Sequence, residues 1–456
     1  MKNRGVATAI INGTIVNEGL SFKGDIIIRE GLIEAIYKEG ELPPLKKIGD
    51  IEIIDVEGSH IFPGVIDDQV HFREPGNAHK GTIESESAAA VLGGVTSYMD
   101  MPNNNPAATT IAALENKNSI AARHSYANYS FYLGATNENI EEIKALNKRE
   151  SCGVKVFMGS STGNMLVNNP HSLEQIFAHS PTLIATHCEE ETIIRKNLKE
   201  AIERYGEKEI PFSCHPKIRD REACIKSTQK AVELALRYNS RLHILHISTK
   251  EEVQILRELS NQTKSITGEV CVHYMLLDST MYDTLGSKMK CNPAIKERND
   301  REAIIQAVKD GVIKVVATDH APHTKEEKEN PYLQAPSGLP LIQHSLQIML
   351  ELHKERLFTL EEIADRMSHS PANLFKIERR GFIREGYYAD LAIVNLNKID
   401  AVSTTKPAYL CGWSPFEGKI FNSSVIHTFV NGLHTVSNGE LTGKRAPIKL
   451  LFNHEE

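Results

Sequence analysis

The sequence lacks the features that would direct it to a membrane, to nucleic acid or out of the cell. It has no run of about 18 apolar residues, so we expect no membrane span, and its basic start has no apolar stretch of signal-peptide length. With 52 Lys and Arg against 59 Asp and Glu, the net charge of −7 offers no basic surface for nucleic acid or anionic lipid. Its seven cysteines, an odd number without a C-x-x-C pair, favour a reducing cytoplasm.

What is present has the composition of an ordinary globular protein, with 41% hydrophobic and 24% charged residues. A chain of 456 residues is long enough for one large domain or two. Both ends carry short β-branched runs separated by Gly-containing turns, as in residues 7–16 and 425–440. Neither end has enough strands to be stable alone, so we predict a composite β-sandwich from residues 1–58 and 381–456.

Between these ends, apolar strand-like runs alternate with amphipathic helical patterns, such as the one over residues 221–240. Eight βα units over roughly 300 residues predict an α/β fold, a (β/α)8 TIM barrel formed by residues 59–380. The expected strands are residues 61–68, 94–101, 129–136, 153–159, 182–187, 241–248, 265–274 and 312–320.

Metal-binding residue types follow several of these runs. In such a barrel the chemistry lies at the carboxyl ends of the strands, and here His71, His187, His246 and Asp319 stand at or just beyond four of them. Imidazole and carboxylate at this density predict Zn²⁺ or a similar transition metal. Two further histidines are interpreted as structural. His243 lies on the opposite face of its strand from His246, and His320 should point away from Asp319 because side chains alternate along a strand.

Lys155 is the unusual member of the set, because it stands inside the apolar run 153–159. Burying its ammonium group costs too much free energy unless the group is paired or neutralised. Two interpretations stay open. One is an ion pair with a carboxylate at the rim of the barrel, and the other is reaction with CO2 to give a carbamate, an anion able to bridge two metal ions.

Taken in order, these residues resemble the dihydroorotases of the amidohydrolase superfamily. The superfamily pattern is a D-x-H-x-H strand, a carboxylated lysine, two single histidines and a late aspartate. The resemblance runs from the N-terminal strands through residues 381–395 and implies one or two Zn²⁺ ions per chain, with Lys155 carboxylated at N6. The positions that match the metal pattern are Asp67, Gln69, His71, Lys155, His187, His246 and Asp319.

Four more segments resemble the substrate-binding segments of dihydroorotases, namely "HFREPG", "DMPNNNP", "KCNPAIK" and "TDHAPH". The resemblance implies that they supply substrate-binding residues and that the loop "APSGLP" lends backbone contacts. Dihydroorotate carries a carboxylate, which suits a fixed guanidinium fork, whereas uncharged cyclic amides need none. The alternative is that the Arg and the Asn cluster only build turns. The residues concerned are Arg73, Asn103, Asn292 and His323.

The resemblance implies reversible cyclisation of N-carbamoyl-L-aspartate to L-dihydroorotate in pyrimidine biosynthesis, with Asp319 as general base and then acid. It also implies a homodimer that acts on a small molecule, and residues 160–169 and 335–342 are candidates for loops over the site. Two alternatives stay open. One is another cyclic amidase, such as an allantoinase or a dihydropyrimidinase, and the other is a non-catalytic homologue that partners aspartate transcarbamoylase.

Gln69 is the departure from the pattern, because it stands where the family has a metal-binding His. An amide oxygen is a poor ligand for Zn²⁺ beside imidazole. Three outcomes therefore stay open. Gln69 binds metal weakly or through water in a two-metal site, the enzyme works with one metal, or the chain has lost catalysis.

Overall fold

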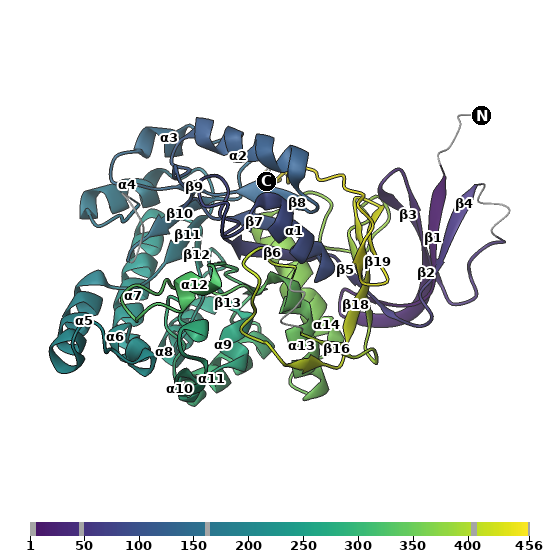
Figure 1. Ribbon diagram of the computed structural model, residues 1–456. Helices are drawn as coiled ribbons and strands as arrows, with labels where there is room; N and C mark the ends of the chain where they lie inside the picture. The colour runs from purple at the N-terminus through teal and green to yellow at the C-terminus, as the bar shows by residue number, and fades with distance from the viewer. Residues whose placement is uncertain (1–5, 45–49, 160–164, 403–407, 455–456) are drawn as a thin grey trace.

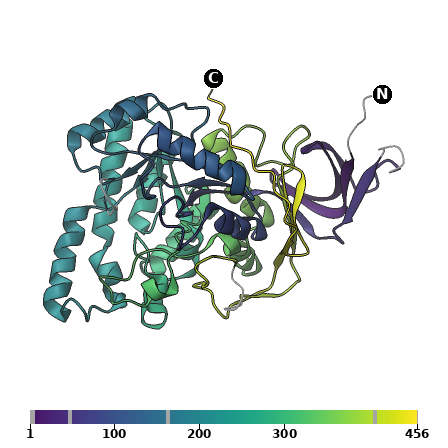
Figure 2. The same cartoon turned by 45° about the horizontal axis from the view of Figure 1, so that its top comes forward.

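The structure, a computed structural model, describes residues 6–44, 50–159, 165–402 and 408–454. Parallel strands occupy the centre with helices around them, and strands from the two ends of the chain lie together at one side (Figures 1 and 2). Within the described residues, no helix is both long and apolar enough to cross a membrane.

The terminal strands form one mixed sheet of nine strands in the order β20-β19-β18-β15-β5-β1-β2-β3, with β4 beside β1. Strand β5 is the seam, since it pairs parallel to β1 and antiparallel to β15. A core of buried isoleucines, including Ile26, Ile61 and Ile393, packs against the sheet. The prediction that the two ends fold together agrees with this pairing, while the sandwich and its boundaries stay predictions. The strands are β1 (Ala7–Asn17), β2 (Leu20–Arg29), β3 (Leu32–Lys38), β4 (Ile51–Asp55), β5 (His60–Pro63), β15 (Leu391–Asn395), β18 (Ser424–Val430), β19 (Leu433–Ser437) and β20 (Glu440–Leu441).

The predicted strand 61–68 differs from the structure, because it is two strands that meet at Gly64. Its first half is β5 of the terminal sheet, and its second half begins the central sheets as β6 (Val65–Val70). Gly64 allows the backbones to approach closely: a Cβ atom there would lie 2.1 Å from Thr96 Oγ1. The apolar run hides this change of sheet because both halves are buried.

The centre consists of two parallel sheets, one of three strands and one of six. The two sheets are consecutive in sequence at β8 and β9, which only Tyr132 separates. A parallel bridge also joins them at their other ends, from Val70 in β6 to His320 just beyond β14. Strands buried on both faces read as continuous apolar runs, which is why the sequence predicted them. The strands are β6, β7 (Val95–Asp100), β8 (Asn128–Phe131), β9 (Leu133–Gly134), β10 (Val154–Phe157), β11 (Ile184–His187), β12 (Leu242–Ile244), β13 (Ile266–Cys271) and β14 (Val315–Ala317).

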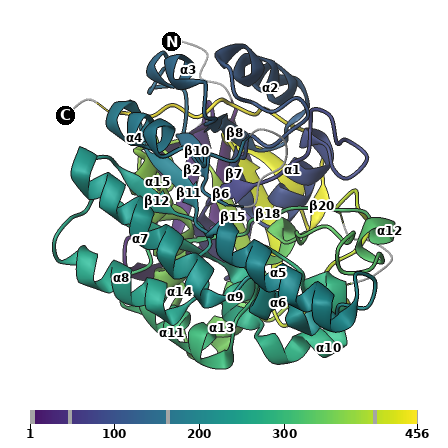
Figure 3. The ribbon, with the colours of Figure 1, turned by 90° about the vertical axis from the view of Figure 1, so that its left-hand side faces the viewer.

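Helices surround these strands (Figure 3). The predicted helix over 221–240 is α7, which begins after an Asp220 N-cap and ends at Asn239 in the left-handed conformation. The longer helices are α1 (Ile83–Leu92), α2 (Ile111–His124), α4 (Pro170–His179), α5 (Glu191–Tyr205), α7 (Arg221–Tyr238), α8 (Lys250–Ser260), α11 (Arg298–Lys309) and α13 (Ser345–Lys354). The shorter ones are α3 (Ile140–Lys144), α6 (His215–Ile218), α9 (Val272–Leu276), α10 (Tyr282–Leu285), α12 (Lys325–Lys328), α14 (Leu360–Ala364) and α15 (Ser370–Phe375).

Candidate functional site

A cavity of about 460 Å³ lies where the central parallel strands end, a volume in the range of small-molecule sites. Of the residues that match the metal pattern or the substrate-binding segments, all except Asp67 line it. These are Gln69, His71, Arg73, Asn103, Lys155, His187, His246, Asn292, Asp319 and His323. Sequence reasoning assigned no role to three further lining side chains, Phe157, Glu191 and Ala321.

One wall of the cavity carries a pair of histidines from neighbouring strands. His187 Nδ1 lies 3.0 Å from His246 Nε2, and His187 Nε2 lies 2.8 Å from Glu189 Oε2. A carboxylate only accepts, so His187 donates from Nε2 and turns the lone pair of Nδ1 toward His246. Burial lowers the pKa of both imidazoles, which are therefore neutral. A carboxylate behind a histidine in this way orients metal-binding imidazoles in proteins.

Glu189 is held in place by a second partner that the sequence did not reveal. Arg219 donates from Nε to Glu189 Oε1 over 3.0 Å, and both side chains are buried. Burial alone would raise the pKa of Glu189, but Arg219 and His187 hold it well below its usual value. The carboxylate is therefore ionised and keeps His187 in the tautomer described above.

Lys155 extends from β10 into the cavity with 1% of its surface exposed. In the described parts of the chain, no hydrogen bond or ion pair reaches its ammonium group, which lies 4.5 Å from the centre of the Phe157 ring. Burial lowers the pKa of Lys155 to about 8. The ion pair weighed from the sequence is thus absent among the described residues, and the amine can lose its proton near neutral pH.

Elsewhere in the cavity lining, Gln69 and His71 meet one carboxylate. Gln69 donates from Nε2 to Asp319 Oδ1 over 3.0 Å, and His71 Nε2 lies 3.0 Å from the same oxygen. His71 Nδ1 lies 2.6 Å from Asn103 Oδ1. Burial would raise the pKa of Asp319, but the contact with His71 lowers it to about 2. Gln69 therefore presents its NH₂ group to the carboxylate, and its oxygen lies 3.9 Å from Cys271 Sγ.

One end of the cavity is cationic. Arg73 Nη2 lies 3.0 Å from His323 Nε2, and Arg73 donates from Nε to the Pro322 carbonyl over 3.0 Å. Lys80 Nζ lies 3.1 Å from His323 Nδ1, which must accept because an ammonium only donates. Burial, with Arg73 and Lys80 nearby, lowers the pKa of His323 well below its usual value. The ring is neutral here, and the positive charge that borders the cavity resides on Arg73.

Lys80 is a residue that the sequence did not single out, and no local pattern marks it in its loop. It is also paired with Glu327 Oε1 at 2.9 Å. Asn292 lines the cavity with an amide oxygen that is buried and accepts no hydrogen bond among the described residues. That oxygen is available to a donor on a bound molecule.

Three lining residues have strained backbones. The φ angles of Arg73, His246 and Asp319 are 66°, 41° and 51°, in the left-handed region. For residues other than glycine this costs about 1–2 kcal/mol each, and such strain gathers at functional sites. The fold therefore holds three lining side chains in orientations that relaxed strands would not give.

The loop 335–342 borders the cavity through Pro336, Ser337 and Gly338. Of the other candidate loop, 160–169, residues 160–164 lie outside the described part of the chain. His320 points away from the cavity toward Glu86, with Nε2 2.7 Å from Oε2. His243 does not line the cavity either.

Comparison with known proteins gives one matching family model, relatives named dihydroorotase and a similar structure named L-hydantoinase. A family model described as "Amidohydrolase family" matches residues 60–434. A dihydroorotase of Methanosphaera stadtmanae is 31% identical over 414 residues, covering 90% of this chain and 92% of the relative. A dihydroorotase of Geobacillus kaustophilus is 31% identical over 432 residues, covering 92% and 98%. The L-hydantoinase (dihydropyrimidinase) structure from Arthrobacter aurescens superposes with a TM-score of 0.91 at 24% identity, covering 97% of this chain and 99% of that chain, which shows a shared fold.

Proposed function

The chain belongs to the amidohydrolase family, and from that premise we propose that it is a zinc-dependent dihydroorotase. It is a metal-dependent cyclic amidohydrolase, and the proposal concerns its substrate and its metal. Its proposed reaction is the reversible cyclisation of N-carbamoyl-L-aspartate to L-dihydroorotate. We propose further that the two central sheets close as a (β/α)8 barrel beside a β-sandwich. A homodimer in the cytoplasm remains the expectation.

The choice of dihydroorotate as the substrate rests on the cationic end of the cavity. Dihydroorotate has a cyclic amide at one end and a carboxylate at the other. The cavity has Arg73 at one end, beside His323, and imidazole and carboxylate groups elsewhere on its walls. A guanidinium fork matches a carboxylate, and an uncharged hydantoin or dihydropyrimidine offers it no partner. The relatives named dihydroorotase support the same choice.

The residues present fit a zinc ion. The facing ring nitrogens of His187 and His246 are 3.0 Å apart, and His246 Nδ1 is buried without a partner among the described residues. With Asp319 and a carboxylated Lys155, they offer the nitrogen and oxygen donors that Zn²⁺ takes. When bound, such an ion polarises the amide carbonyl and lowers the pKa of a water molecule.

Each remaining step belongs to side chains of the cavity. Arg73 holds the substrate carboxylate through charge-assisted hydrogen bonds, helped by His323 and by the NH₂ group of Asn103. Asn292 accepts a hydrogen bond from the pyrimidine ring. During hydrolysis, Asp319 takes a proton from the attacking water and gives it to the ring nitrogen as the C–N bond breaks. During ring closure it removes that proton from the carbamoyl nitrogen.

Gln69 supports the one-metal outcome among the three weighed from the sequence. Its amide group donates to Asp319, so the hydrogen bond uses the side chain that would otherwise complete a second metal site. A carboxylate fixed in this way stays ionised and oriented toward the reacting atoms. We therefore propose a single catalytic zinc on the His187 and His246 side, with Gln69 as a positioning residue for Asp319.

Substrate preference of the zinc-loaded protein tests the proposal. Dihydroorotate, dihydrouracil, hydantoin and allantoin are compared at equal concentration by the loss of their cyclic amide. A dihydroorotase turns over the first in large excess over the three uncharged rings. Faster turnover of an uncharged ring would assign the chain to another cyclic amidase, and no turnover of any would favour the non-catalytic homologue.

A further inference from the structure

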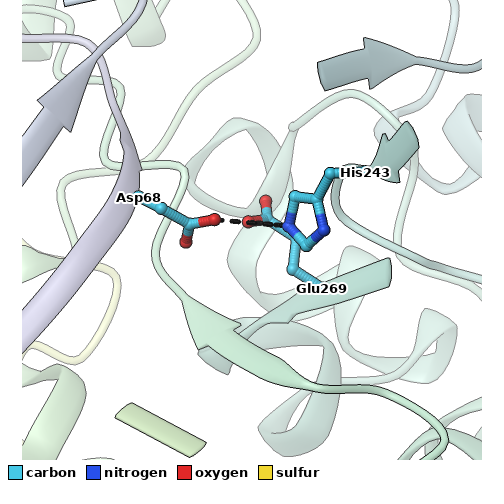
Figure 4. Close-up of side chains that lie close together, drawn as sticks. All are labelled: Asp68, His243 and Glu269. Atoms are coloured by element: carbon cyan, nitrogen blue, oxygen red, sulfur yellow. Dashed lines mark hydrogen bonds and ion pairs between the residues drawn. The ribbon is translucent and has the colours of Figure 1, made fainter. Parts of the chain in front are cut away.

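Three side chains that do not line the cavity converge between the central strands. Asp68 comes from β6, His243 from β12 and Glu269 from β13 (Figure 4). Each is 0% exposed. His243 Nε2 lies 3.3 Å from Asp68 Oδ2 and 3.3 Å from Glu269 Oε2, and one donor atom from each residue lies within 4.8 Å of the other two. A nitrogen and two carboxylates thus face one point inside the protein.

The tautomer of His243 follows from its other ring nitrogen. His243 Nδ1 lies 2.8 Å from Thr267 Oγ1, and Thr267 donates its hydroxyl proton to the Leu242 carbonyl over 3.3 Å. The hydroxyl oxygen therefore accepts, and Nδ1 carries a proton. The remaining nitrogen, Nε2, faces two carboxylates. A positive charge must lie between them, either protons or a metal ion, since three lone pairs would otherwise repel.

A proton on His243 leaves most oxygens of the two carboxylates without a hydrogen bond among the described residues. Among the described residues, neither oxygen of Asp68 has a hydrogen-bond partner, and Glu269 Oε1 has none. One N–H at Nε2 serves one acceptor, and it is Glu269 Oε2 that meets hydrogen-bond geometry. Within the described part of the chain, Asp68 then keeps only its 3.3 Å contact with His243 Nε2, and a fully buried carboxylate with so little compensation carries a large desolvation cost.

We propose that Asp68, His243 and Glu269 bind a divalent metal ion of the size of zinc at a site separate from the cavity. Tetrahedral zinc with bonds near 2.0–2.1 Å keeps its donors about 3.3–3.4 Å apart, which matches the two separations from His243 Nε2. One dication with two carboxylates and a neutral imidazole makes the buried cluster neutral. The orphaned oxygens of Asp68 and Glu269 supply a further donor, and Thr267 holds the imidazole as partners of metal-binding histidines do.

Zinc content of the full-length protein tests the site. The protein is expressed with added zinc, and bound metal is measured by elemental analysis in wild type, in a His187→Asn/His246→Asn variant, and in that variant with Asp68→Asn. The double variant should retain a single zinc equivalent per chain, and adding Asp68→Asn should remove it. Asp283→Asn, at an exposed position, is the matched control and should change nothing.

Two results would overturn the proposal. One is a double variant without zinc. The other is folded Asp68→Asn protein that keeps all the metal of its parent, which would mean that the cluster holds protons. Anomalous diffraction at the zinc edge from wild-type crystals settles the question even if a variant misfolds. A peak between Asp68 and Glu269 is expected, and its absence refutes the site. This test does not use turnover, so it stands apart from the proposed function.

Discussion

Replacing Arg73 by alanine removes the guanidinium group at the cationic end of the cavity. Arg73 Nε is already used by the Pro322 carbonyl, so a substrate carboxylate meets the remaining N–H groups of the fork. A hydrogen bond to a charged group contributes about 1.5–3 kcal/mol. Since about 1.36 kcal/mol is a tenfold change, kcat/KM for dihydroorotate should fall by roughly 10- to 150-fold, mainly through KM. Arg73→Lys keeps the positive charge but not the forked guanidinium group, so its kcat/KM should lie between those of the wild type and Arg73→Ala.

The assay compares dihydroorotate with dihydrouracil, which lacks the carboxylate, as substrate or as competitive inhibitor. Arg73→Ala should weaken the charged ligand and leave the uncharged one nearly unchanged. Arg123→Ala, at an exposed position on α2, is the control for loss of a positive charge. Equal loss for both ligands would refute the role of Arg73 in reading the carboxylate and would assign it to packing the loop around Pro322.

Three other perturbations test separate parts of the account. The neutral amine of Lys155 is the form that reacts with CO2, and the pKa of Lys155 is about 8. Metal uptake by protein stripped of its metal should therefore require bicarbonate and should rise as pH increases through 8. Metal uptake without CO2 at every pH would contradict the carbamate. Glu189→Gln removes the negative charge of the group that accepts from His187 and should weaken zinc binding about 10- to 100-fold in a chelator competition, and unchanged affinity would argue against ligation by His187. Gly64→Ala places a Cβ 2.1 Å from Thr96 Oγ1 and should lower the free energy of unfolding in urea by about 1–3 kcal/mol. Thr96→Ala in the same chain should recover part of that loss, and no recovery would place the strain elsewhere.

The sequence predicts the central strands well because parallel strands are buried on both faces and read as apolar runs. It also predicts which polar side chains share the cavity, since residues after such runs reach one edge of the sheets. His71, His187 and Asp319 were found in this way, although they are far apart in sequence.

What the sequence could not reveal depends on contacts between distant segments. The split of residues 61–68 into two sheets follows from the approach of Gly64 to Thr96, which no local pattern records. Arg219 supports Glu189 from a separate turn, and Lys80 reaches His323 across a loop. None of these side chains interrupts an apolar run in a way that marks a site.

His243 is another residue whose contacts with distant segments the sequence could not reveal. Its spacing from His246 indicated that it faces away from the cavity, and it does not line it. The spacing could not indicate that Asp68 and Glu269 meet it, because that depends on how three strands are aligned across the sheets.

The central claim is tested most directly by dihydroorotate hydrolysis on zinc-loaded protein, with His246→Asn as the matched inactive control. The account predicts turnover in the wild type, its loss in the variant, and formation of dihydroorotate from N-carbamoyl-L-aspartate in the reverse direction. Zinc-loaded, folded wild-type protein that leaves dihydroorotate unchanged in both directions would contradict it.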